Sequence, residues 1–144
     1  MTRFGNRAIL VLLTSIACIA LGQDKPTAPN STGTADLLKS FHTIQVRTGT
    51  WLSKPEMLQG ALQKHDEFDA WGLSIVSGSD ADTVLSIDHQ PGWFYYTYSL
   101  THTATGTVLA AGKVDAWDGN AACKKISDEL IKRIKKVRPL PAKT

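Results

Sequence analysis

Cysteine is nearly absent from this sequence, whose 144 residues contain two, Cys18 and Cys123. We expect Cys18 to be removed with the amino-terminal segment, so the mature chain keeps Cys123 alone and can form no internal disulfide. Its fold must then be stabilised by the apolar core, for which the length is sufficient. Cys123 opens the apolar stripe of the last predicted helix, which favours a buried thiol over a reactive one.

Motifs for catalysis are also lacking. The sequence has no glycine-rich phosphate loop and no nucleophile elbow, and we predict no cofactor, no metal and no catalytic residue. A metal site needs two or more converging ligands, and His89 and His102 meet that need only if strand pairing brings them together. These two histidines carry the alternative hypothesis of a small hydrolase or metal-dependent enzyme. A third, His65, lies on the apolar stripe of its helix and is expected to be partly buried.

The sequence has one long apolar run, Ala8–Leu21, which follows Arg3 and Arg7. A basic start, a short apolar run and small residues after it are typical of a secretory signal peptide, here 1–22. The sequence therefore predicts an exported protein of the periplasm or the extracellular space. An uncleaved anchor and lipid attachment at Cys18 remain alternatives, although the run is short for a membrane span.

The rest of the chain divides into three parts by composition. Segment 23–34 has almost no apolar residues and is expected to be a flexible leader. Residues 35–138 form a single domain, and residues 139–144, which begin with a proline, form a loose tail.

Apolar residues alternate with period two in several segments and recur at helical spacing in two others. The predicted order is β-α-β-β-β-β-α, which gives an α+β, two-layer sandwich: a mostly antiparallel sheet with two helices on one face. The expected strands cover 41–48, 73–76, 83–88, 93–101 and 108–117, and the expected helices cover about 55–70 and 121–137, with a helical turn at 35–40.

The clearest pattern is a hairpin whose arms are 93–101 and 108–117. Large residues of the first arm face small residues of the second, so the two sets interdigitate on the core side. A bulge at Gly106 gives the register that we favour. The predicted core residues of the hairpin are Phe94, Tyr96, Tyr98 and Leu100, opposite Val108, Ala110, Gly112, Val114 and Ala116.

The same register places Trp93, Tyr95 and Trp117 together on the opposite face of the hairpin. An exposed aromatic cluster can stack on sugars or accept a side chain of a protein partner, so these residues are the first candidate binding site. The alternative is that a terminal segment or the connection with Trp51 covers them.

Charge is distributed unevenly along the chain. Residues 23–123 contain 6 basic and 11 acidic residues, whereas the chain from Lys124 onward contains 8 basic and 2 acidic ones. The basic patch at the end of the last helix is a second candidate site, for an anionic membrane surface or a polysaccharide; export argues against nucleic acid. The alternative is a solvated helix end favoured by the helix dipole. The patch consists of Lys132, Arg133, Lys135, Lys136 and Arg138.

A further pattern runs through residues 81–109: Ala81-Asp82 before a strand, alternating Tyr96 and Tyr98, and Thr105-Gly106 in a turn. It resembles a pattern in bacterial envelope proteins, namely the amino-terminal domain of TolB and the CsgG-like and LpoB-like lipoproteins. This resemblance implies a periplasmic binding or scaffolding domain, and it carries over no catalytic residue.

The sequence thus favours an exported, non-catalytic domain that binds an envelope component, either a protein or a polysaccharide. Besides the enzyme alternative, a structural subunit that assembles through a free sheet edge stays open.

Overall fold

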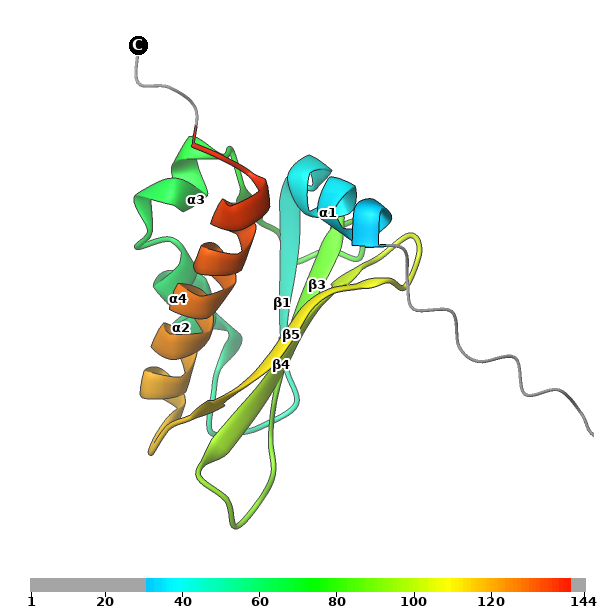
Figure 1. The fold of residues 1–144 in the computed structure, drawn as a ribbon. Coiled ribbons are helices and arrows are strands. Elements are labelled where there is room, and N and C mark those ends of the chain that lie inside the picture. Colours follow the sequence, from blue (N-terminus) through cyan, green and yellow to red (C-terminus); the bar gives the residue numbers. More distant parts are fainter. Residues whose placement is uncertain (1–30, 141–144) are drawn as a thin grey trace, which may run out of the picture.

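The computed structural model describes residues 31–140 (Figure 1). The predicted signal peptide, Cys18 and the last four residues of the predicted tail lie outside this part of the chain. Among the described residues, no helix has both the length and the apolar character needed to cross a bilayer.

One five-stranded sheet forms the centre of the molecule, with strand order β2-β1-β3-β4-β5. Helices α2 and α4 contact each other and cover one face of the sheet, α2 over β1 and α4 over β4 and β5 (Figure 1). The predicted α+β sandwich is confirmed. The strands are β1 (Thr43–Thr48), β2 (Ser74–Ile75), β3 (Thr83–His89), β4 (Tyr95–His102) and β5 (Val108–Asp115), and the helices are α1 (Ser31–Ser40), α2 (Pro55–Leu62), α3 (Asp66–Ala70) and α4 (Gly119–Val137).

Strand direction in the sheet is mixed. The β3-β4-β5 part is antiparallel, as the hairpin pattern predicts, whereas β1 runs parallel to both of its neighbours, β2 and β3. Alternation of apolar and polar residues sets which side chains face the core, but it says nothing about strand direction. The helical crossover between β1 and β2 was the one sequence signal of a parallel pair, whereas nothing in the sequence indicated that β3 pairs with the other side of β1.

Two helical segments differ from expectation. Helix α1 begins at Ser31, inside the predicted leader, because Leu38 is buried in the core and the helix that carries it packs against α4 and β5. The single helix predicted over 55–70 is divided into α2 and α3, because His65 has an extended backbone and precedes the first residue of α3.

The hairpin builds the core largely as predicted. Tyr96, Tyr98 and Leu100 are buried, and Tyr98 pairs with Gly112. A Cβ atom at Gly112 would lie 2.6 Å from the Tyr98 ring, so the ring occupies the space that any other residue would fill. The expected match of large residues against small ones is confirmed at this position.

Two hairpin residues expected in the core are exposed instead. Phe94 is 62% exposed because β4 begins after it, at Tyr95, and the covered part of the sheet ends there. Val108 is 51% exposed because the register shifts between Leu100 and Thr101, which makes Leu109 an extra residue and buries it. The irregularity lies here and not at Gly106, which occupies the turn with φ +67°.

Candidate functional site

Exposed aromatic side chains gather at one end of the sheet, the lower end in Figure 1. Three connections meet there: 49–54 after β1, 90–94 between β3 and β4, and 116–118 between β5 and α4. Together they hold four large side chains that remain in contact with solvent, and we call these the aromatic tip. They are Trp51, Trp93, Phe94 and Trp117, exposed by 88%, 59%, 62% and 84%.

Connection 90–94 projects furthest at this end and is held by its own hydrogen bonds (Figure 1). His89 Nε2 donates to the carbonyl oxygen of Trp93 at 2.8 Å, and the hydroxyl of Tyr95 donates to Oε1 of Gln90. The His89 ring also lies 4.6 Å from the ring of buried Tyr96, which fixes it to the core. The backbone that presents Trp93 and Phe94 is therefore fixed, while their rings point into solvent.

Gly119, the first residue of α4, packs closely against connection 49–54, which carries Trp51. A Cβ atom at Gly119 would lie 1.9 Å from the carbonyl oxygen of Leu52, so the two segments approach as closely as a glycine permits. The carboxylate of Asp118 accepts a hydrogen bond from the backbone N–H of Ala121 at 2.8 Å and caps the helix. This junction holds the backbone at Leu52, the residue after Trp51, against the start of α4, two residues after Trp117.

The rings of this end form two pairs. Trp93 contacts Tyr95, with ring centroids 6.1 Å apart, and the ammonium of Lys113 lies 3.7 Å from the centre of the Tyr95 ring. Trp117 instead contacts Phe94, at 4.6 Å between centroids. The predicted cluster of Trp93, Tyr95 and Trp117 is therefore divided, because the chain leaves the sheet after Asp115 to begin α4. Trp51, expected as a possible cover, adds an exposed ring instead.

Three of the five residues of the predicted basic patch form hydrogen bonds or ion pairs with other groups of the protein. The guanidinium of Arg138 donates to the carbonyl oxygens of Phe41 and Trp71, at 2.9 and 2.7 Å. Lys135 pairs with Glu67 at 2.8 Å, and this hydrogen bond lowers the pKa of Glu67.

Arg133 pairs with Glu129 at 3.0 Å, within α4. Of the five predicted patch residues, Lys132 and Lys136 remain exposed without a described ion pair. They line a small depression of about 340 Å³ together with Arg133 and Glu129.

The two histidines of the enzyme alternative do not converge. His89 pairs with Tyr96 at one end of the β3-β4 ladder, and His102 pairs with Thr83 at the other end. Six residues of strand separate the two ends, which is roughly 20 Å. Within residues 31–140, no group of three or more His, Cys, Asp or Glu side chains is placed to hold a metal ion. The shared site that this hypothesis required is therefore not formed by these histidines.

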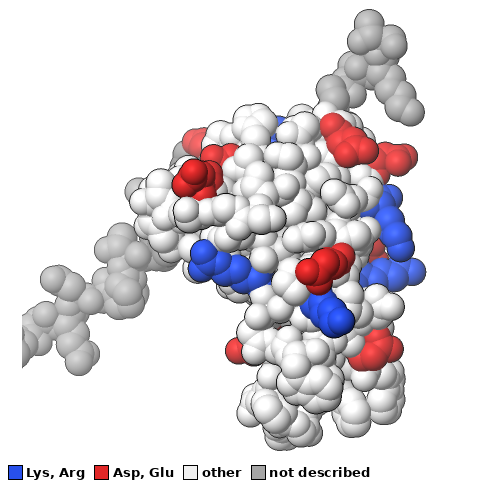
Figure 2. Space-filling view, turned by 180° about the vertical axis from the view of Figure 1, so that it is seen from behind, with Lys and Arg blue, Asp and Glu red and all other residues white. Residues whose placement is uncertain are grey.

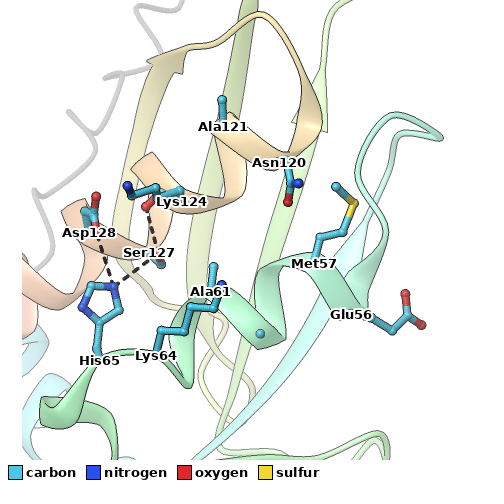
Figure 3. Close-up of a pocket in the computed structure, with 11 residues that line it drawn as sticks. Glu56, Met57, Ala61, Lys64, His65, Asn120, Ala121, Lys124, Ser127 and Asp128 are labelled. Carbon is cyan, nitrogen blue, oxygen red and sulfur yellow. Dashed lines mark hydrogen bonds and ion pairs between the residues drawn. The ribbon is translucent and has the colours of Figure 1, made fainter.

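A groove of about 710 Å³ lies between α2 and α4, and it contains a histidine, a serine and a carboxylate (Figure 3). His65 Nε2 lies 3.4 Å from Ser127 Oγ and 3.3 Å from an Asp128 oxygen. A catalytic relay needs the carboxylate and the hydroxyl on opposite ring nitrogens, whereas here both lie at the same one. Ser127 Oγ also donates to the carbonyl oxygen of Lys124. The cluster joins the two helices and does not activate a nucleophile, and His65 is partly buried as predicted.

Burial raises the pKa of acidic groups in the core. It raises the pKa of Tyr98 to about 12 and also raises the pKa of the Cys123 thiol, which is fully buried. Both groups are therefore neutral at physiological pH. The buried thiol predicted from the sequence is confirmed, and Cys123 is not placed for reaction with a substrate.

Comparison with known proteins gives limited similarity. No protein family and no curated protein matches this chain. The chain is similar to the structure of a candidate lipoprotein from Caulobacter crescentus CB15, with 16% identity and a TM-score of 0.39 over 72% of this chain and 96% of that one. It is also similar to the PelC dodecamer from Paraburkholderia phytofirmans, with 14% identity and a TM-score of 0.35 over 72% of this chain and 91% of that one. The resemblance to the TolB, CsgG and LpoB types stays a prediction.

Proposed function

We propose that this protein is an exported, non-catalytic binding domain of the cell envelope, and that the aromatic tip is its binding surface. The observation that supports this is the exposure of four large aromatic side chains at one end of the sheet. Single exposed apolar residues are common on folded proteins, but a group of large ones at one place indicates an interaction surface.

The tip offers enough apolar surface for reversible binding. Removing one large apolar side chain from water contributes about 2 kcal/mol. Because burial on binding is incomplete, four such side chains contribute on the order of 6 kcal/mol, from which the entropy of association is subtracted. Before that subtraction, about 6 kcal/mol corresponds to a dissociation constant of about 40 μM. We therefore expect weaker binding than this, which must be measured at protein concentrations of about 100 μM or more.

The free edges of the sheet support assembly less well than the tip does. The edge strand β2 has two residues, and the edge strand β5 carries a register shift and the exposed side chains of Lys113 and Asp115. Bulges, short strands and charges are the features that prevent edge strands from pairing with a second chain. The structural-subunit alternative is therefore the less favoured one.

The test is sedimentation of the chain from residue 23 onward with washed bacterial envelope fragments. We expect the wild type to sediment and the combined variant Trp51→Ser/Trp93→Ser/Phe94→Ser/Trp117→Ser to bind at least about tenfold less, which corresponds to 1.4 kcal/mol or more. The matched control is Lys132→Ser/Lys136→Ser, which removes two exposed side chains far from the tip. Equal sedimentation of the wild type and the tip variant, both with an unchanged urea midpoint, would refute the proposal.

A further inference from the structure

The aromatic tip has rings on both sides of the sheet end. Tyr95 lies on the face opposite buried Tyr96, so the Trp93–Tyr95 pair lies on the face that α2 and α4 leave uncovered. The carbonyl oxygen of Phe94 accepts a hydrogen bond from Ala116 N–H, so pairing continues past β4 and places Phe94 on the helix-facing side. The Phe94–Trp117 pair thus lies on the other side of the same end.

The shape of the tip is convex. Connection 90–94 extends beyond the neighbouring connections (Figure 1), and the groove between α2 and α4 is lined by none of the four tip residues. Small molecules and single polymer strands are generally bound in concave sites with a few converging polar groups. The Trp93 and Phe94 rings of this projecting connection lie on opposite sides of the sheet end and suit a ligand that can contact both sides at once, which is a property of a fluid interface.

The charge of the tip matches a neutral interface. Figure 2 shows no Lys, Arg, Asp or Glu side chain at the lower end of the molecule, in the view from behind. The three connections contain one basic and one acidic residue, Lys54 and Asp118, so their own net charge is zero. The exposed residues that flank them at the strand ends are also of both signs, namely Asp88, Lys113 and Asp115. Lys132 and Lys136 are exposed in the second half of α4, away from the tip. Lys124 and Lys125, which are also exposed, lie nearer to the start of this helix.

We propose that the aromatic tip inserts into the boundary between headgroups and acyl chains of a phospholipid bilayer. Tryptophan is enriched at this depth because its ring is apolar while its N–H finds hydrogen-bond partners among the headgroups. The inference rests on the proposed function and identifies the envelope component as lipid. Because the tip is neutral, insertion requires no anionic lipid and is insensitive to salt.

Tryptophan fluorescence with pure phosphatidylcholine vesicles tests this inference. Three of the four tryptophans belong to the tip, and the fourth, Trp71, is buried and provides a constant background. With the chain from residue 23 onward, we expect vesicles to shift the emission to shorter wavelength, and bromine-labelled acyl chains to quench it. The shift should persist at about 0.5 M salt, and Trp93→Ser/Phe94→Ser should weaken vesicle binding at least about fivefold.

The matched variant Lys132→Ser/Lys136→Ser should bind neutral vesicles as the wild type does. Binding that requires anionic lipid, disappears in salt and is lost in this variant would overturn the inference in favour of the basic residues of α4. If the protein does not bind neutral vesicles but still binds envelope fragments through the tip, the inference of a lipid ligand is wrong. The ligand is then a protein or a polysaccharide. In that case the proposed function stands, whereas loss of tip-dependent binding in both assays refutes both.

Discussion

At the end of the sheet where β1 and β3 begin, charged side chains turn back onto the protein, whereas at the opposite end large rings point away from it. The Asp82 carboxylate accepts hydrogen bonds from the N–H groups of His42 and Thr43, at 2.8 and 3.0 Å. Arg138 binds two carbonyl oxygens at the same end. At the aromatic tip, Phe94 contacts Trp117 and Trp93 contacts Tyr95, and all four rings of the tip remain largely exposed.

The difference shows why charge density in a sequence is a poor guide to a binding surface. Backbone groups at the ends of strands and helices need partners, and long charged side chains supply them from nearby. Rings on a projecting connection have no such role within the fold. Within the basic segment, Arg138 is bound to backbone carbonyl oxygens and Arg133 and Lys135 form ion pairs, whereas the aromatic residues of the tip remain exposed to solvent.

The largest effect should come from Gly119, which joins two connections of the aromatic tip. We expect Gly119→Ala to lower the free energy of unfolding by about 3 kcal/mol, because the new Cβ atom collides with the backbone at Leu52. Gly60→Ala, in the middle of α2 with open space around it, is the matched control and should raise stability by about 0.5 kcal/mol. Urea unfolding measures both; similar values for the two variants would show that the close approach is not structural.

A smaller effect is expected for Arg138. Arg138→Ala leaves the carbonyl oxygens of Phe41 and Trp71 without their donor and should lower the free energy of unfolding by about 2 kcal/mol. Lys136→Ala, which removes an exposed charge two residues earlier, should change it by less than about 0.5 kcal/mol. If urea midpoints shift equally in both variants, the basic end acts through its total charge, and the contrast between the two ends fails.

The smallest effect depends on pH and concerns Asp82. Its hydrogen bonds with the backbone N–H groups of His42 and Thr43 lower its pKa in the folded state. Ionised Asp82 therefore stabilises the fold above its unfolded pKa, near about 3.9, and this contribution is lost as the pH falls through the folded value. Asp82→Asn should cost about 1 kcal/mol at neutral pH and less in acid.

Urea unfolding at neutral and acidic pH checks this prediction, with Asp80→Asn as the control. Asp80 is exposed, and its carboxylate accepts a hydrogen bond from the neighbouring Ser79 hydroxyl. If the difference in free energy of unfolding between wild type and Asp82→Asn stays constant with pH, the negative charge of Asp82 does not stabilise the start of β1.

The sequence predicted most of the fold because alternation and helical spacing report burial directly. It could not predict that β1 lies between β2 and β3, because strand order depends on long-range packing, nor that one extra residue buries Leu109 in place of Val108. For the candidate site, Trp93 and Trp117 were identified correctly as exposed. Trp51 was missed as a member, because its place depends on strand order and on the close approach at Gly119.

The position of the chain ends relative to the tip gives the molecule a direction. Helix α4 starts beside the tip and ends at Val137, and the next residue, Arg138, is hydrogen-bonded to Phe41 near the start of β1. With 19 residues, α4 is about 28 Å long. A ligand bound at the tip would therefore lie a full helix length away from Pro139 and Leu140, where the described part of the chain ends, and would not contact that end of the molecule.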